Sequence, residues 1–216
     1  MYHKNGKRIV AVDFETTGIN HNDSAPLTLG LAWKNQDHEY RTDHIELNIF
    51  DHFYHTWSPE AAIVNNIDFF TKHNLPTDTV GANVPNVQDR TDWYIFNNLL
   101  HLASWTHELI PVGWNVNGFD MRFMLHYFPK SAEMFYYSSL GELNTMCSVM
   151  DSVIGRKTGQ TKKLVKTRAT HKIEADHADI HKQGAHNAEY DALHSLMCYE
   201  QLDEEFSRLS LELNLR

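Results

Sequence analysis

The chain has only two cysteines, no C-x-x-C pair, and no apolar run long enough to cross a bilayer. Cys147 and Cys198 both lie in apolar stretches, which favours reduced core thiols over a disulfide or a metal site. The first eight residues are charged and have no apolar run of the kind found in signal peptides. We therefore expect a cytoplasmic protein without a membrane partner.

The chain also lacks net positive charge, because its 216 residues carry a formal charge of −9. This balance argues against a general basic nucleic-acid binder. The distribution is uneven: residues 152–173 hold seven Lys or Arg and no acid, which leaves −16 on the remainder. Acid is therefore concentrated where metal ions would bind, and base in one segment.

Internal repeats are absent, and a hydrophobic content of 42% with 11 Phe and 5 Trp excludes a disordered chain. A length of 216 residues suits one domain with a substantial core. We expect one α/β domain over residues 1–216, with a mixed central sheet of about five strands and flanking helices.

The hydrophobic pattern predicts an antiparallel meander followed by alternating helices and strands. The predicted strands are Arg8–Glu15, Leu27–Trp33, Glu39–Leu47, Ile110–Trp114 and Phe135–Tyr137. The predicted helices are Ser58–Phe70, Thr91–Leu109, Gly118–Tyr127, Leu143–Ile154 and Asn187–Phe206. The apolar stripe of the second of these helices comprises Ile95, Phe96, Leu99, Leu100, Leu102 and Ala103. Residues 72–89 and 155–175 are predicted loops, the second of them basic and flexible.

The first strand ends in two acids, Asp13 and Glu15, and a turn, Thr16-Thr17-Gly18. Alternate side chains of a strand share a face, so both carboxylates point the same way. Two buried like charges repel, and a divalent cation is their simplest partner. An edge strand with two solvated acids is the alternative, which this stretch alone leaves open.

Three further residues have the same chemical character. Asp120 lies at a predicted helix start just past the fourth strand, Asp191 lies in the first turn of the last helix, and His186 precedes Asp191 by five residues. Taken singly, an acid at a helix N-terminus is explained by the helix dipole. A single His is explained by a structural role, because the chain has 15 of them.

Together these residues resemble the motifs of the DEDDh family of 3′–5′ exonucleases. The first motif resembles Asp13 to Gly18, the second Asn115 with Phe119-Asp120, and the third His186 with Asp191. The resemblance covers about residues 8–205. Two positions differ from many members, since Trp114 replaces a His before the second-motif Asn and Asn144 replaces an Asp after the fifth strand.

The resemblance implies a ribonuclease H-like fold, with the first and fourth strands adjacent at the centre of the sheet. It also implies phosphodiester hydrolysis with two Mg²⁺ or Mn²⁺ held by Asp13, Glu15, Asp120 and Asp191. His186 would then take the proton of the attacking water. His177 and His181 are better interpreted as loop or helix-face residues than as metal ligands.

The expected partner is a nucleic acid with a free 3′-OH, and the sequence does not identify protein partners. The backbone and hydroxyls of Thr16 and Thr17 are candidates for the terminal 3′-OH, Asn115 for orienting a neighbour, and Phe14 and Phe119 for stacking on bases. Phe123 is a further stacking candidate, although we prefer core packing for it. Single-stranded DNA is the preferred substrate class, RNA the alternative, and an inactive 3′-end-binding protein or a nucleotide phosphoesterase the rival functions.

The basic segment is a candidate docking strip for the phosphate backbone, because the rest of the chain would repel a polyanion. Its candidate contacts are Lys162, Lys163, Lys166 and Arg168. A solvated mobile loop is the alternative interpretation.

Overall fold

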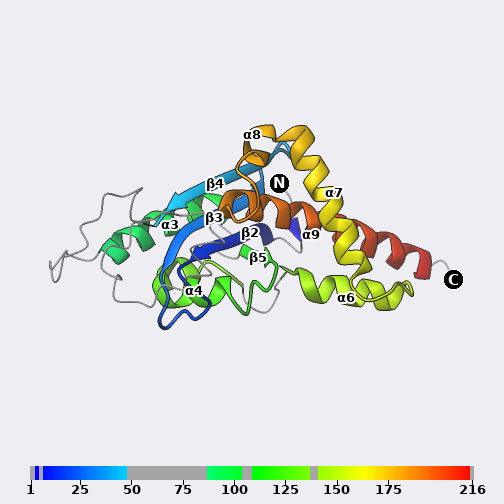
Figure 1. Cartoon of the computed structure of the whole chain (residues 1–216), viewed down its shortest axis with the longest axis horizontal. Coiled ribbons are helices and arrows are strands. Elements are labelled where there is room, and N and C mark those ends of the chain that lie inside the picture. The colour runs from blue at the N-terminus through cyan, green and yellow to red at the C-terminus, as the bar shows by residue number, and fades with distance from the viewer. Residues whose placement is uncertain (1–2, 5–6, 48–86, 104–108, 137–140, 215–216) are drawn as a thin grey trace.

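The computed structural model describes residues 3–4, 7–47, 87–103, 109–136 and 141–214 (Figure 1). The strands in these ranges are β1 (His3–Lys4), β2 (Lys7–Thr16), β3 (Pro26–Lys34), β4 (Tyr40–Glu46), β5 (Leu109–Gly113) and β6 (Gly141–Glu142). The helices are α3 (Val87–Ala103), α4 (Asp120–Tyr127), α5 (Pro129–Ala132), α6 (Leu143–Val153), α7 (Gln160–Asp176), α8 (Ala178–His181) and α9 (Ala188–Asn214). The predicted helix Ser58–Phe70 lies outside the described residues.

The sheet has the strand order β4-β3-β2-β5-β6, and β1 pairs with β2 outside this path. β2, β3 and β4 form the predicted antiparallel meander, whereas β5 runs parallel to β2 and β6 parallel to β5. The leading strand of the meander therefore lies at the centre beside β5. This is the strand order of a ribonuclease H-like fold, and the predicted fold class is confirmed.

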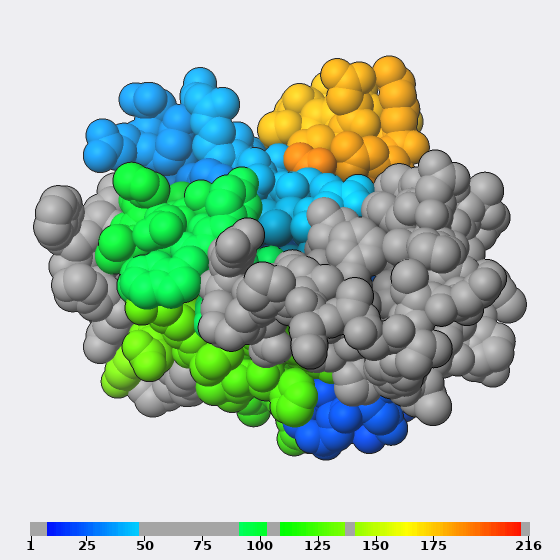
Figure 2. All heavy atoms as spheres, turned by 90° about the vertical axis from the view of Figure 1, so that its left-hand side faces the viewer, coloured from blue at the N-terminus to red at the C-terminus, as the bar shows by residue number. Residues whose placement is uncertain are grey.

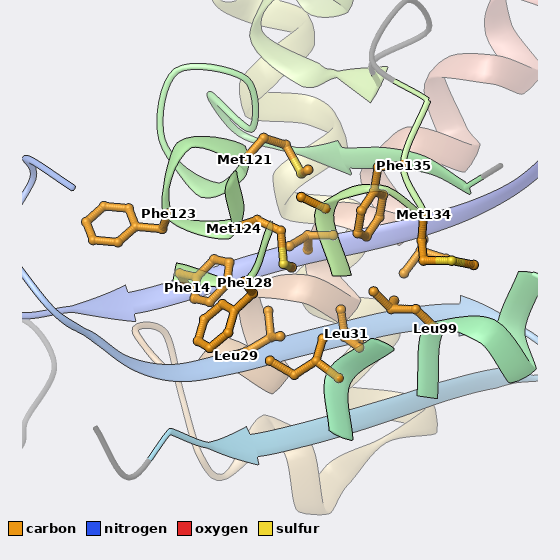
Figure 3. Packing of buried hydrophobic residues seen from close by; sticks show 14 of the residues in the cluster. Phe14, Leu29, Leu31, Leu99, Met121, Phe123, Met124, Phe128, Met134 and Phe135 are labelled. Atoms are coloured by element: carbon orange, nitrogen blue, oxygen red, sulfur yellow. The ribbon is translucent and has the colours of Figure 1, made fainter. Parts of the chain in front are cut away.

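Helices cover both faces of the sheet, and each face has its own core. Val10, Val12 and Phe14 of β2 pack with residues of α3, α4 and α5 (Figure 3). Ile9 and Ala11 point to the other face, where they pack with α6, α7 and α9. Because side chains alternate along a strand, the odd-numbered residues of β2 face α9.

A buried acid joins α3 to α5 on the first of these faces. The Asp92 carboxylate accepts hydrogen bonds from the backbone N–H groups of Lys130, at 3.0 Å, and Ser131, at 2.9 Å. These N–H groups open α5 and have no partner within the helix itself. On the outer surface, the atoms of α3 lie against those of residues 109–136, the next described segment (Figure 2).

The predicted basic loop at 155–175 is wrong, because residues 160–176 form the helix α7. The buried residues Thr161, Val165, Ala169 and Ile173 recur every four positions, and the last three pack in the core that contains α9 residues. Such spacing is that of one helix face, and the Lys and Arg residues between them are good helix formers. Gly155, Gly159 and the threonines favoured a loop in the prediction, because such residues are common in loops.

An acid on α6 fixes the start of α7. Asp151 accepts hydrogen bonds from the N–H groups of Gly159, at 2.7 Å, and Thr161, at 2.9 Å. The Thr161 hydrogen bonds are the main cause that lowers the pKa of Asp151. The basic helix therefore has a defined position against α6 and α9.

Other boundaries differ from the predicted ones. The second predicted helix corresponds to α3, which begins at Val87 and ends at Ala103, and Leu109 already belongs to β5. In its stripe Ile95 and Leu99 are buried, whereas Leu100 is exposed. The edge strand beside β5 is Gly141–Glu142, and among the described residues of the predicted fifth strand Phe135 makes an isolated bridge to Leu109.

Two composition-based predictions concern the thiols and the membrane. Cys147 and Cys198 are buried free thiols in the core beside α9, as predicted. Within the described ranges, no helix combines the length and apolar character that a membrane span requires.

Candidate functional site

The two acids of β2 lie on the sheet face that α9 covers. Asp13 pairs with Gly30 of β3, and Glu15 pairs with Thr28. Their side chains share the face of Ile9 and Ala11, as the two-residue period of the strand requires. Glu15 is buried, so the alternative of two solvated acids on an edge strand is wrong.

The start of α9 packs directly on the backbone of β3. A Cβ atom added at Gly30 would lie 1.9 Å from the carbonyl oxygen of Ala188, the first residue of α9. This close approach, which needs a residue without a side chain, holds the first turn of α9 beside Asp13. Asp191 lies in that turn, as predicted.

The third-motif residues are joined by a local hydrogen bond. The backbone N–H of His186 donates to Oδ2 of Asp191 at 2.8 Å. His186 adopts a positive φ of 66°, a conformation that residues other than glycine seldom adopt. The turn before α9 thereby places the exposed His186 beside Asp191.

Asp120 reaches the same region from the other neighbour of β2. Pairing of β2 with β5 ends at Ala11, so the last residues of β2 extend beyond it. The N–H of Phe14 donates to Oδ1 of Asp120 at 2.9 Å, and this acid is the first residue of α4. β3 and β5 lie on the two sides of β2, and the chain connects them to β2 in different directions. This arrangement makes the end of β2 a switch point of the sheet.

The ligand atoms of Glu15, His186 and Asp191 all lie within 4.8 Å of one another. Asp13 and Asp120 are outside this three-residue group, but their charges interact with it. Three segments far apart in the sequence thus bring all five motif residues to one region. Carboxylate and imidazole groups at this separation fit a hard divalent cation.

Burial and mutual repulsion raise the pKa of each acid. Burial raises the pKa of Asp13 well above its usual range, and the charges of Asp120, Asp191 and Glu15 raise it further. Burial and then Asp191 raise the pKa of Glu15 to about 8. Without a cation, this group of acids holds protons that a free carboxylate would have lost.

The other two acids have partly compensating neighbours. Burial raises the pKa of Asp120 well above its usual range, although the hydrogen bond from Phe14 lowers it. Burial also raises the pKa of Asp191, while His186 and Lys166 lower it. Lys166 therefore exerts its positive charge on the acidic group.

The metal-free protein is expected to be more stable at about pH 5 than at about pH 8. The pKa of Glu15 rises from an ordinary 4.5 to about 8, and those of the three Asp residues are also raised. Between the ordinary and the raised values the native state binds more protons than the unfolded state, so the free energy of unfolding falls as pH rises. Urea unfolding in EDTA over this pH range measures the effect.

Added Mg²⁺ serves as the control for this stability profile. It should flatten the fall in stability, because cations rather than protons would then neutralise the acids. A free energy of unfolding that rises with pH across this window in EDTA would contradict the raised pKa values.

Three of the predicted substrate contacts are occupied within the fold. The Phe14 ring is 3% exposed and stacks on Phe128 at 6.1 Å, so it belongs to the core and the prediction of base stacking is wrong (Figure 3). Thr16 donates its hydroxyl to the carbonyl of Gly18 at 2.5 Å. The Thr17 hydroxyl accepts from the N–H of Ala25 at 2.8 Å. Both threonines are buried, and their hydroxyls form hydrogen bonds within the β2–β3 loop. A contact of their backbone with a terminal 3′-OH stays a prediction.

The remaining residues of the second motif are more accessible. Asn115 is exposed with a φ of 62°, and its N–H donates to Glu142 Oε1 at 2.9 Å. Phe119 is half-buried, with its ring 5.0 Å from that of Phe123. Phe123 itself is in the core, as preferred from the sequence.

Sequence reasoning missed Glu142. Besides Asn115, it accepts from the N–H of Asn144, which caps α6, and its charge contributes to the raised pKa of Asp120. The available signal was its position just before the predicted helix at Leu143, where an acid favours the helix start.

The four basic candidates lie on different sides of α7. Lys162 and Lys166 place their Nζ atoms 4.9 Å and 4.6 Å from the centre of the Trp114 ring. Arg168 instead lines a small cavity with Gln201 and Glu205 of α9. Lys163 is exposed, and only the first pair lies beside the segment that follows β5.

His177 and His181 occupy structural positions, as interpreted from the sequence. The His177 ring lies edge-on to Tyr40 at 5.7 Å, and His181, in α8, lies 6.4 Å from the Tyr190 ring. Among the described residues, the group that could hold a metal ion includes His186 but neither of these two.

Comparison with known proteins gives a distant structural likeness. No family model and no curated protein matches the chain. A structure of E. coli Exonuclease I in complex with a dT13 oligonucleotide matches with a TM-score of 0.39 and 13% sequence identity. The match covers 58% of this chain and 24% of that one, so the chain spans about a quarter of the length of Exonuclease I.

Proposed function

We propose that this chain is a metal-dependent 3′–5′ exonuclease that releases 5′-mononucleotides from single-stranded nucleic acid. The observation that supports it is the convergence of Glu15, His186 and Asp191 within 4.8 Å, with Asp13 and Asp120 electrostatically linked to them. The direction of attack rests on the resemblance of the three motifs to those of DEDDh exonucleases. Single-stranded DNA is the first substrate to test, and RNA the second.

The four acids would hold two Mg²⁺ or Mn²⁺. Bound divalent cations would supply Lewis-acid stabilisation for the phosphate charge and lower the pKa of water. The raised pKa values fit this assignment, because cations would remove the repulsion that now favours protonation of the acids.

His186 would accept the proton of the attacking water. Its ring is exposed at the edge of the acidic group, and its backbone is held by Asp191. In the reaction, the water oxygen forms a bond to phosphorus, the bond from phosphorus to the 3′ oxygen of the preceding nucleotide breaks, and that oxygen takes a proton from solvent. The products are a 5′-mononucleotide and a shortened strand with a new 3′-OH.

Incubation of 5′-labelled single-stranded DNA and RNA with Mg²⁺ should give a ladder that shortens from the 3′ end. EDTA should abolish it, because the acids then lack the cations that neutralise them, and a 3′-terminal phosphate should block it, because the free hydroxyl is lost. Matched 3′-labelled strands show whether the label leaves in the first product. Removal from the 5′ end, internal nicks, or end binding without turnover would contradict the proposal.

A further inference from the structure

Lys162 and Lys166 form a paired cationic site with Trp114. The two residues are one helical turn apart on α7, so they project from the same side of the helix. Both Nζ atoms lie within 5 Å of the indole centre, at 4.9 Å and 4.6 Å. Lys162 also donates to Oδ1 of Asn144 at 2.7 Å. Cation–π contacts and this hydrogen bond hold the two long side chains in defined positions.

This pair lies at the same edge of the sheet as the acids. Trp114 follows the last residue of β5, and Asn144 lies in the first turn of α6, directly after β6. β5 and β6 run parallel to β2, so their carboxyl ends and the end of β2 share one edge. The effect of Lys166 on the pKa of Asp191 agrees with this closeness.

The charges of the pair call for an anion. Within the described part of the chain, neither Lys162 nor Lys166 forms a salt bridge with a carboxylate. Like charges one helical turn apart repel each other, and an ammonium group has three donors to offer. A phosphodiester placed between them would relieve the repulsion and accept hydrogen bonds from both.

We propose that Lys162 and Lys166 together bind a backbone phosphate near the 3′ end of a single-stranded nucleic acid. The proposal rests on the proposed function, because the acids define where the 3′ end lies. It gives the strand a path from the acids past Trp114 toward the start of α6. Arg168 is outside this path, because it faces α9 on the other side of α7. Lys163 is also outside it.

The test compares two double variants with the same loss of charge. Lys162→Gln with Lys166→Gln removes the pair, and Lys163→Gln with Arg168→Gln removes two other positive charges of α7. Binding of a fluorescein-labelled single-stranded oligonucleotide is measured by anisotropy in EDTA, over a range of salt concentrations. The pair variant should bind about tenfold more weakly and lower the salt slope of log K by about 0.7, because the pair neutralises one phosphate, whereas the control variant should change both by much less.

A second measurement locates the phosphate. Replacing single phosphates of the oligonucleotide by uncharged methylphosphonate should weaken binding to the parent protein most near the 3′ end. At that position the pair variant should show no further loss, because the cations that recognise the charge are already gone. Thermal unfolding of both variants checks that each remains folded.

These results separate the inference from the proposed function. Equal losses in the two variants, no loss in the pair variant, or no binding by the parent would overturn the inference. Digestion from the 3′ end with an unaffected pair variant would leave the function standing without it. Binding that depends on the pair, without any digestion, would support the inference for a 3′-end-binding protein and overturn the exonuclease assignment. In active enzyme the pair variant should raise KM about tenfold and change kcat less than about threefold.

Discussion

Asp13→Asn should lower kcat for 3′-end digestion at least about a thousandfold, which is ~4 kcal/mol of transition-state stabilisation. Asp13 lies at the electrostatic centre of the proposed site, because the charges of Asp120, Asp191 and Glu15 all raise its pKa. The substitution keeps the shape of the side chain and removes an anionic oxygen ligand for the cations. Single-turnover digestion of a 5′-labelled strand at saturating Mg²⁺ measures the loss.

The same substitution should stabilise the metal-free protein at neutral pH. Removing one of four mutually repelling acids removes part of the cost of their ionisation. Higher stability together with lost activity would separate a functional role of Asp13 from a structural one. Asp37→Asn, in the exposed β3–β4 turn, is the matched control and should change neither quantity. Retention of more than about a tenth of the parent kcat would exclude Asp13 as a metal ligand in the reaction.

Gly30→Ala should destabilise the protein by about 3 kcal/mol and lower kcat about a hundredfold. The added Cβ would lie 1.9 Å from the Ala188 oxygen, 2.2 Å from its carbonyl carbon and 2.7 Å from the Glu189 nitrogen. These are backbone atoms, so the start of α9 must move away from β3, which disrupts the packing between them. Asp191 would move with it, and a displacement of about 1 Å at a catalytic group costs on the order of a hundredfold in rate.

Urea unfolding and steady-state digestion, both below the unfolding temperature of the variant, measure these two effects. Gly155→Ala is the control, because nothing lies within 4 Å of its added Cβ and its φ is +69°. It should cost about 1 kcal/mol of stability through backbone strain alone, with kcat unchanged. A folded Gly30→Ala protein with the parent kcat would show that the position of α9 on β3 does not control the site.

The sequence was sufficient for the features that depend on local patterns. The two-residue period of the first strand placed Asp13 and Glu15 on one face, and the meander and the helix starts at Asp120 and Asp191 followed from equally local signals. The position of these acids in the fold agreed with the resemblance to the DEDDh family. Such features are predictable because the periodicities of strands and helices depend on residues that are close together in the sequence.

Local patterns failed where burial depends on distant partners. The helical face of α7 that packs in the core consists of Val165, Ala169 and Ile173, which become recognisable as core only against α9. The Phe14 ring lies among α4 and α5 residues more than a hundred positions later in the chain. Its position between two candidate metal ligands favoured a role at the site, although the pleat of β2 directs it to the opposite face.

Only the tertiary structure decided how the acidic site is held in position and which lysine side chains lie next to it. Gly30 contacts the start of α9, and Trp114 contacts Lys162 and Lys166, through pairs of segments that no short-range pattern relates. The sequence determined which residues are candidates for the chemistry, because charged groups and turn residues are visible singly. Packing of the chain determined which of them meet, because close contact between distant segments depends on the free energy of the whole fold.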